Sequence, residues 1–322
     1  MVKLSDIAEE AGCSVTVVSR VLHPGGAVRH RIAEATRERV LSAASRLRYH
    51  PNRSAEFLKR GVLPEIGLCT TDAANNLVLD LVRGASAEAE REGFYVSFRY
   101  SLMPVGGVEF LREAARRHLC GIIIYPDFLL REEEQALLRE YQAGGGEVVV
   151  LDVGNERHPE WDLPTVTIDD EQGGRLAARH LLACGAEHFF YQGVERRRQD
   201  GFLAELASAG RTARVFQHDE EEKAVAVCLA QQGAVGLFCS NDWLALQVHS
   251  LLLRAGEVPG KRIRLIGYDD LYGSAAVSPA LTTVRQPFNA AGEAAVKMLI
   301  DRLYGRPLAN CRLTPEVEVR ET

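Results

Sequence analysis

The segment Ser14–Leu22, with the sequence SVTVVSRVL, determines how the N-terminal part of this chain folds. Serine suits a helix start, because its side chain accepts a hydrogen bond from a backbone N–H of the first turn. At about 100° per residue one arc of the helix is apolar, and it carries Val17, Val18, Val21 and Leu22. The other arc is short, polar and cationic, and it carries Thr16, Ser19, Arg20 and, at its edge, Val15. Such a face suits a helix that enters the DNA major groove N-terminus first, although an ordinary amphipathic helix shows the same pattern.

Two neighbouring helices favour the DNA-binding interpretation. The i, i+3, i+4, i+7 spacing of Leu4, Ile7, Ala8 and Ala11 predicts a helix over residues 4–11. Gly12 ends it, since glycine adopts the left-handed cap conformation without strain. Two short helices joined by a tight glycine turn form a helix-turn-helix, and a third helix over about residues 32–46 closes a small core.

A short helical segment, residues 53–60, follows this bundle. Asn52 can cap it, and Ala55 and Leu58 lie on one of its faces. A helix of this length is marginal alone in water, so a partner would have to order it. The alternative is that residues 53–60 are a plain interdomain linker. Residues 61–64 resemble a linker whether or not the preceding segment is helical.

Charge is distributed unevenly along the 322 residues. Residues 1–62 carry a net charge of +5, and the remainder carries −11. A basic head on an acidic body indicates that the head, and not the body, meets a polyanion. The seven scattered cysteines form no C-x-x-C pair, so neither a disulfide framework nor a metal site is predicted. We expect no cofactor. Because acids occupy the place of a signal-peptide core and no apolar run reaches about 18 residues, we expect a cytoplasmic protein.

From Glu65 onward, strand-like and helix-like segments alternate, which is typical of doubly wound parallel sheets. Nine strands fit two such sheets better than one. They are predicted at residues 66–70, 94–100, 121–126, 147–152, 165–168, 188–193, 213–216, 234–239 and 262–268.

Several segments together resemble the LacI/GalR family of transcriptional regulators. In the head these are LSDIAEEAG-CSVTVVSRVL, ATRERVLSAASRLRYHPNRSA and the following Leu58. In the body they are GFYVSFRYS, CGIIIYP, VTIDDEQGG, RQDGF, CSNDWLAL, LIGYDD and LTTVRQP, in family order. The resemblance covers the whole chain. It implies an α/β protein with a helix-turn-helix headpiece (1–50), a hinge helix and linker (51–63), and a body (64–322) of two periplasmic-binding-protein-like lobes. Lobe one would comprise 64–163 and 286–308, and lobe two 164–285 and 309–322.

The resemblance also assigns DNA contacts. Val15, Thr16 and Arg20 would face bases in the major groove. Phosphate contacts would come mostly from Ser14, Ser19, Tyr49 and Asn52, with Arg53 in the same DNA-binding set. Ala55 and Leu58 of the hinge helix, paired with that of a second subunit, would enter the minor groove, where apolar side chains kink the duplex. The implied protein is a homodimeric repressor of operator DNA.

Ligands of doubly wound sheets bind beyond the carboxyl ends of the strands. Five polar residues lie at such ends: Asp72, Asn76, Arg198, Asn241 and Asp269. Planar polar groups of these types make paired hydrogen bonds to neighbouring hydroxyls, so a sugar or sugar derivative is the expected effector. By family resemblance Arg198, Asn241 and Asp269 would contact it. Asn241 would also cap the next helix, and Asp269 with Asp270 would fit a simple turn.

Three departures from the family pattern leave alternatives open. Val17 stands where the family usually has threonine, and the connection of residues 23–31 is longer than usual. The segments 193–198 and 211–219 are short, so a regulator whose cleft no longer binds a metabolite is one alternative. A solute-binding protein is another, but the basic head disfavours it. Enzyme motifs are absent; Gly256–Lys261 is one residue short of a phosphate-binding loop. We therefore expect no enzyme.

Overall fold

The computed structural model describes residues 2–22, 32–49, 63–70, 76–100, 106–124, 132–153 and 163–322. The N-terminal part is a three-helix headpiece with α1 (Leu4–Ala11), α2 (Val15–Leu22) and α3 (Glu34–Arg46). Its core includes Ile7, Val18, Val40 and Ala43, all fully buried. Gly12 has a φ of 61° and caps α1 as predicted. Helix α3 begins two residues later than predicted, because Ala33 is its N-cap and accepts the first helical hydrogen bonds.

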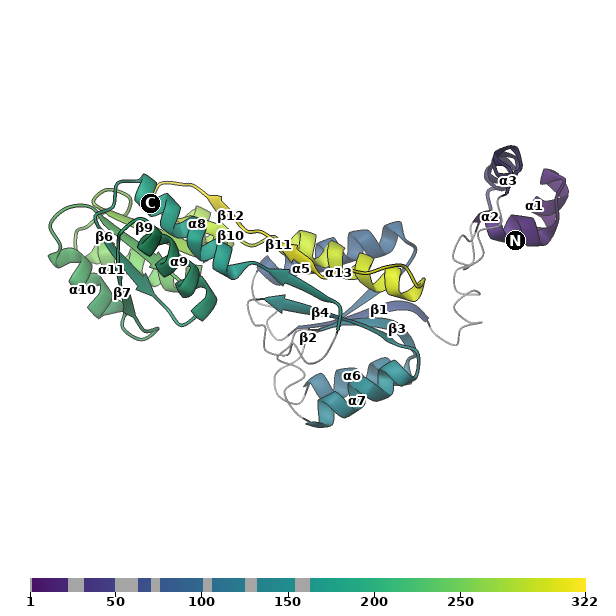
Figure 1. The fold of residues 1–322 in the computed structure, drawn as a ribbon, viewed down its shortest axis with the longest axis horizontal. Coiled ribbons are helices and arrows are strands. Elements are labelled where there is room, and N and C mark those ends of the chain that lie inside the picture. The colour runs from purple at the N-terminus through teal and green to yellow at the C-terminus, as the bar shows by residue number, and fades with distance from the viewer. Residues whose placement is uncertain are drawn as a thin grey trace.

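The first lobe is a six-stranded parallel sheet in the order β11-β5-β4-β3-β1-β2. Helices α5 (Asn76–Arg91) and α13 (Phe288–Leu303) cover one face, and α6 (Gly106–Arg116) and α7 (Glu132–Ala143) cover the other (Figure 1). The strands are β1 (Leu63–Thr70), β2 (Tyr95–Tyr100), β3 (Leu119–Ile124), β4 (Glu147–Val153), β5 (Thr165–Ile168) and β11 (Cys311–Leu313).

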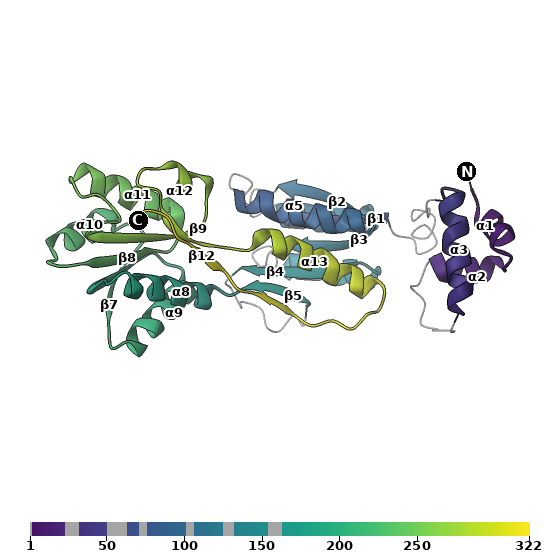
Figure 2. The ribbon, with the colours of Figure 1, turned by 90° about the horizontal axis from the view of Figure 1, so that it is seen from above.

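The second lobe repeats this design in the order β12-β10-β9-β8-β6-β7, with only β12 antiparallel among its strand pairs. The strands are β6 (His188–Gln192), β7 (Ala213–Phe216), β8 (Val235–Cys239), β9 (Ile263–Asp269), β10 (Thr282–Arg285) and β12 (Glu316–Glu318). Helices α8 (Asp170–Ala183) and α9 (Arg196–Ser208) pack on one face. Helices α10 (Glu221–Ala230) and α11 (Asp242–Arg254) pack on the other, and α12 (Tyr272–Ala276) follows β9. Figure 2 shows the two lobes side by side along the long axis of the molecule.

The strand pairing shows that two of the predicted lobe boundaries are wrong by a few residues. Strand β5 pairs with β4, and β11 pairs with β5, so both belong to the first sheet. Val166 and Ile168 are buried in the first-lobe core, which explains why this strand does not open the second lobe. The chain therefore crosses after Ile168 rather than at 163/164, and it returns after Leu313 rather than at 308/309. A third crossing lies between β10 and α13, next to Gln286.

All nine predicted strands form, with some ends shifted, and β10, β11 and β12 add to them. The three additional strands are short and have few apolar residues, so their sequences carry a weak strand signal. No helix in the described parts of the chain is long and apolar enough to span a bilayer.

Candidate functional site

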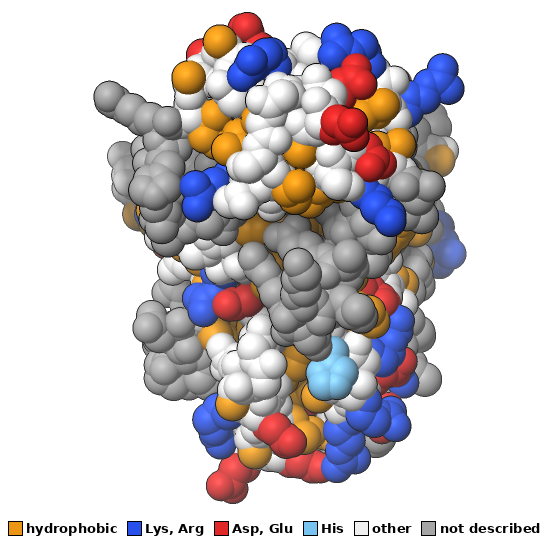
Figure 3. All heavy atoms as spheres, turned by 90° about the vertical axis from the view of Figure 1, so that its right-hand side faces the viewer, with side chains coloured by type: hydrophobic (Ala, Val, Ile, Leu, Met, Phe, Trp, Pro, Cys, Tyr) orange, Lys and Arg blue, Asp and Glu red, His pale blue; other side chains and the backbone are white. Residues whose placement is uncertain are grey.

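The outer face of α2 is the candidate DNA-contacting surface. Val15 is 46% exposed, Thr16 and Arg20 are exposed, and Ser19 is half-buried. The backbone carbonyl of Ser14 accepts hydrogen bonds from Val17 and Val18, and its hydroxyl accepts a longer one from the Val17 N–H (3.4 Å). Ser14 therefore begins the helix as predicted. Figure 3 looks onto the end of the molecule that bears the headpiece, where Lys and Arg side chains spread over the surface, several beside acids.

Tyr49, a predicted phosphate contact, packs against the headpiece core. Its backbone N–H donates to the carbonyl of Ala44 at 2.8 Å, and burial raises the pKa of its hydroxyl. An ion pair between Arg46 Nε and Glu10 Oε1 (3.0 Å) ties α3 to α1. The predicted DNA contacts Asn52, Arg53, Ala55 and Leu58, and the predicted effector contact Asp72, lie outside the residues that the structure describes.

Arg198 is the centre of a buried polar cluster in the second lobe. Its guanidinium donates to the backbone carbonyl of Ser240 (2.6 Å) and lies 3.7 Å above the ring of Tyr268. Nε is 3.2 Å from the Asp170 carboxylate, and one terminal nitrogen is 3.6 Å from the Asp269 carboxylate. The two carboxylates keep the guanidinium charged against the cost of burial and raise its pKa. The cluster therefore brings together Arg198 and Asp269, two of the residues predicted from the sequence as effector contacts.

Asp269 ends β9 in a left-handed backbone conformation, with a φ of 115°. Its carboxylate accepts a hydrogen bond from the amide of Gln286 (2.7 Å). Burial raises the pKa of Asp269 to about 7, and Arg198 opposes that rise. A non-glycine residue in this conformation is uncommon and is found mostly where the surrounding structure fixes it, often at functional sites.

Glycines bring the helices of this cluster together. A Cβ at Gly174 would lie 2.0 Å from the carbonyl oxygen of Arg198, and one at Gly201 would lie 1.9 Å from that of Glu171. Helices α8 and α9 therefore cross at backbone contact. This close crossing places Asp170, at the start of α8, within reach of Arg198 on α9.

Asn76 connects the two lobes. Its side-chain amide donates to the carbonyl of Asp270 (3.1 Å), and its side-chain oxygen accepts the N–H of Tyr272 (3.2 Å). Beside it is a cavity of about 470 Å³, lined from lobe one by α5 and from lobe two by residues that include Asp269 and Gln286. The predicted residues Asn76 and Asp269 therefore border one interlobe cavity.

Asn241 caps α11, accepting the Leu244 N–H at 2.9 Å, as the sequence predicts. Its neighbour Asp242 is fully buried and accepts hydrogen bonds from Ser274, Thr283 and the backbone of Leu271. Burial raises the pKa of Asp242 to about 6. This carboxylate fastens β10 and α12 to the start of α11.

Sequence reasoning missed several polar residues of the cluster: Asp170, Gln192, Ser240, Asp242 and Gln286. Four of them lie inside or next to the segments IDDEQGG, CSND and VRQP, which carried the family resemblance. The available signal was their position, because each lies at the carboxyl end of a strand or within three residues of it.

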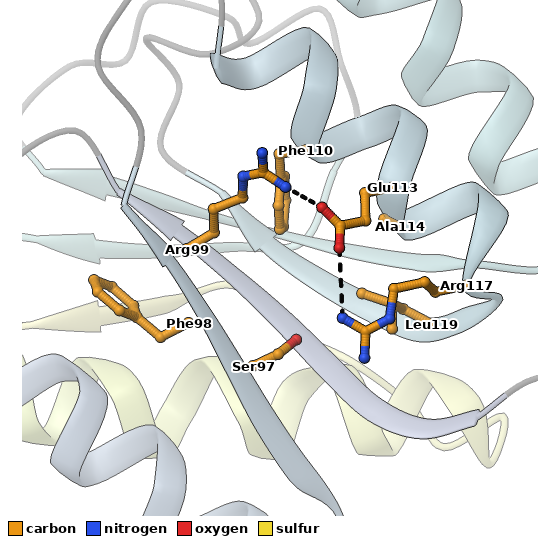
Figure 4. A pocket seen from close by; sticks show the side chains of 8 residues that line it. All are labelled: Ser97, Phe98, Arg99, Phe110, Glu113, Ala114, Arg117 and Leu119. Atoms are coloured by element: carbon orange, nitrogen blue, oxygen red, sulfur yellow. Dashed lines mark hydrogen bonds and ion pairs between the residues drawn. The ribbon is translucent and has the colours of Figure 1, made fainter.

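A second cavity of about 240 Å³ lies between β2 and α6 (Figure 4). Arg99 and Arg117 point toward Glu113 from two sides and form ion pairs with it. Arg117 also pairs with Glu65 at 2.7 Å. The cations of this cavity are thus already neutralised, which makes it a poorer ligand site than the interlobe cavity. The described residues hold no group of three or more His, Cys, Asp or Glu side chains suited to a metal ion.

Comparisons with known proteins identify the family to which this architecture belongs. A sequence model of bacterial regulatory proteins of the lacI family matches residues 3–52, and one of periplasmic binding protein-like domains matches residues 165–322. The chain is 31% identical to the ribose operon repressor of Bacillus subtilis (strain 168), over 96% of this chain and 94% of that one. The chain belongs to the LacI family.

Solved structures agree with this assignment. The Lac repressor dimer bound to operator and the anti-inducer ONPF superposes with a TM-score of 0.66 at 25% identity, over 100% of this chain and 98% of that one. A LacI-family regulator from Enterococcus faecium with bound ribose gives 0.65 at 25% identity, over 80% and 97%. This LacI-family chain is a DNA-binding transcriptional regulator and not an enzyme. The predicted fold class is confirmed.

Proposed function

We propose that this regulator is a repressor whose operator affinity is controlled by a small carbohydrate in the cleft between its lobes. The observation that carries the proposal is the buried cluster of Arg198, Asp269 and Gln286, which adjoins the interlobe cavity. Carboxylate, amide and guanidinium groups fixed in place suit the hydroxyls of a sugar. Two relatives support this effector class, one named for a ribose operon and one solved with ribose.

We infer that residues 1–50 bind DNA, that residues 51–63 form the hinge, and that residues 64–322 bind effector and dimerise. Val15, Thr16 and Arg20 would face bases, while Ser14, Ser19 and Tyr49 would contact phosphates. Asn52, Arg53, Ala55 and Leu58 complete the DNA-binding set. A protein that acts on operator DNA would work in the cytoplasm.

A homodimer is the form in which we expect the protein to act. Large apolar side chains are exposed on two neighbouring elements of lobe one: Leu79 on α5 (53%) and Tyr95 and Phe98 on β2 (73% and 40%). Strand β2 is also an edge of its sheet. An apolar patch beside an open edge is what a second copy would cover. The Lac repressor, solved as a dimer on operator, supports the same assembly.

One observation favours the alternative of a cleft that binds no metabolite. Arg198 already has partners in Asp170, Asp269, Ser240 and Tyr268, so it needs no ligand to satisfy its charge. Against this, the side-chain oxygen of Gln286 is buried without a hydrogen-bond partner. An unsatisfied buried acceptor costs about 1–3 kcal/mol, which a ligand hydroxyl would recover.

The test is selection of bound DNA fragments by the full chain, with and without a panel of sugars and nucleosides. We expect one enriched operator sequence, bound by the full chain and not by residues 63–322 alone. A sugar should shift both operator affinity and thermal unfolding. Equal operator binding by the truncated body would contradict the DNA-binding assignment. Effector control would be contradicted if no panel member changed either measurement.

A further inference from the structure

Polar side chains stand in a row along the carboxyl edge of the second-lobe sheet. Four adjacent strands contribute, in the order β10, β9, β8 and β6. Their residues are Gln286, Asp269, Ser240 and Gln192. We call these four residues, with Arg198 beneath them, the edge row.

Unsatisfied buried polar atoms are concentrated in the edge row. Within the described parts of the chain, the buried side-chain nitrogen and oxygen atoms without a hydrogen-bond partner are Gln192 Oε1, Arg198 Nε, Ser240 Oγ and Gln286 Oε1. Arg198 Nε has an ionic neighbour in Asp170 at 3.2 Å, and the Ser240 hydroxyl faces the Glu195 carboxylate. The two glutamine oxygens have no such neighbour, and Gln192 is completely buried. A ligand that donates hydrogen bonds would satisfy these buried acceptor oxygens.

The charge around the edge row is negative. Three carboxylates surround the Arg198 guanidinium: Asp170, Asp269 and Glu195. Asp170 and Asp269 lie within ion-pair distance of it, and Asp170 also accepts the hydroxyl of Tyr268 at 2.7 Å. One guanidinium therefore balances at most one of the three acids. A ligand phosphate or carboxylate would add repulsion, whereas a cation would relieve it.

Glu195 is the acid of the three that lies outside the ion pairs of Arg198 within the described residues. It is the N-cap residue of α9, yet its side chain makes no capping hydrogen bond, and its carboxylate accepts only a long hydrogen bond from the Val194 N–H (3.3 Å) besides facing the Ser240 hydroxyl and its own N–H. It is half-buried, so a ligand can reach it. Gly193 brings it next to the edge row: a Cβ there would lie 1.9 Å from Ser240 Oγ and 3.3 Å from Glu195 Oε2. Only a residue without a side chain leaves this space to the hydroxyl and the carboxylate.

We propose that Gln192, Glu195 and Ser240 form a subsite for a protonated amine, and that the effector is an amino sugar rather than a neutral or phosphorylated sugar. The proposal rests on the proposed effector-binding function and names its ligand class. The ammonium would lie against the Glu195 carboxylate and donate to the oxygens of Ser240 and Gln192. The hydroxyls of the same ligand would meet Asp269 and Gln286, farther along the row.

Matched sugar pairs test the ligand class. Isothermal titration calorimetry on the full chain would compare glucosamine with glucose, galactosamine with galactose, and mannosamine with mannose, with N-acetylglucosamine and glucose 6-phosphate added. We expect at least one amino sugar to bind tenfold or more tightly than its parent sugar, and glucose 6-phosphate to bind more weakly than glucose. In Glu195→Gln the amine should lose about tenfold, while the parent sugar stays within about twofold.

Glu187→Gln is the matched control. Glu187 is exposed and precedes β6. Its replacement by glutamine removes the same charge as Glu195→Gln, but from the opposite edge of the same sheet, so it should leave the amine preference unchanged. The amine proposal is overturned if no amine binds, if amines bind no better than their parent sugars, or if the preference survives in Glu195→Gln. Operator binding measured in parallel separates the two ideas. A neutral sugar that shifts operator affinity would preserve the proposed function and overturn only the amine subsite.

Discussion

Gly174→Ala should damage the proposed effector site although Gly174 is not one of the proposed ligand contacts. The new methyl group would lie 2.0 Å from the carbonyl oxygen of Arg198 and 2.9 Å from the backbone nitrogen of Phe202. An ordinary carbon–oxygen contact is about 3.3 Å, so α9 would have to move by about 1.3 Å away from α8. Both obstructing atoms belong to the backbone, and no side-chain rotation can clear them.

Two opposing terms set the stability change. Overpacking of this kind costs about 1–3 kcal/mol. Alanine recovers about 1 kcal/mol because it favours the helix more than glycine does. The net loss is therefore about 0–2 kcal/mol, and its upper end corresponds to a fall in Tm of a few degrees for a lobe of this size. The same displacement would pull Arg198 from Asp170, now 3.2 Å away, and weaken effector binding by roughly tenfold or more.

Differential scanning fluorimetry with and without the sugar selected above measures both effects. Gly144→Ala is the control, since its new methyl group would lie 3.4 Å from the nearest atom, an ordinary contact. We expect the control to match the wild type in Tm and in effector response. The reasoning is refuted if Gly174→Ala also unfolds at the wild-type temperature and keeps the wild-type effector affinity.

Three further predictions concern the headpiece, the hinge and pH. Operator affinity of the full chain should fall steeply with salt in a gel-shift series, since each phosphate that the basic head neutralises releases counterions; a flat profile would contradict this. Leu58→Gly should reduce the ratio of operator to random-DNA affinity and leave the Tm of the body unchanged, because a wedge acts only where the minor groove opens; equal losses on both DNAs would make the segment a plain linker. Burial raises the pKa of Asp242 to about 6 and that of Asp269 to about 7, above the ordinary 3.8. Between 3.8 and these raised values the folded protein binds more protons than the unfolded chain, so folding stability should decline as the pH rises through that range. Unfolding curves from pH 4 to 8 should show a shallower decline in Asp269→Asn than in the wild type.

Sequence patterns predicted most of the fold because periodicity reports burial directly. The four apolar residues of α1 and the alternation in TVTI are examples, and both elements form where expected. The lobe boundary was misplaced because a strand signal does not say which sheet the strand joins. TVTI is followed by a helix of lobe two, but its backbone partners lie in lobe one.

The buried cluster of lobe two was predicted in part for a related reason. A polar residue after a strand is visible in the sequence, and Arg198 and Asp269 were found in this way. Burial and pairing are not visible: nothing in the letters shows that Asp170 reaches Arg198, since this depends on two glycines that let α8 and α9 cross at backbone contact. Tertiary proximity, rather than residue type, separates the cluster from the other polar residues at strand ends.

The pairing of Arg198 changes how its role is best tested. As a predicted effector contact alone, its replacement by alanine would report on ligand binding. In the structure it also neutralises Asp170 and Asp269, and removing one partner of a buried ion pair costs about 3–5 kcal/mol. Arg198→Ala would therefore unfold the sheet edge and abolish ligand binding by either route. Glu195 faces the Ser240 hydroxyl, but within the described residues the ion pairs of Arg198 are with Asp170 and Asp269, so substitution of Glu195 separates ligand recognition from stability better.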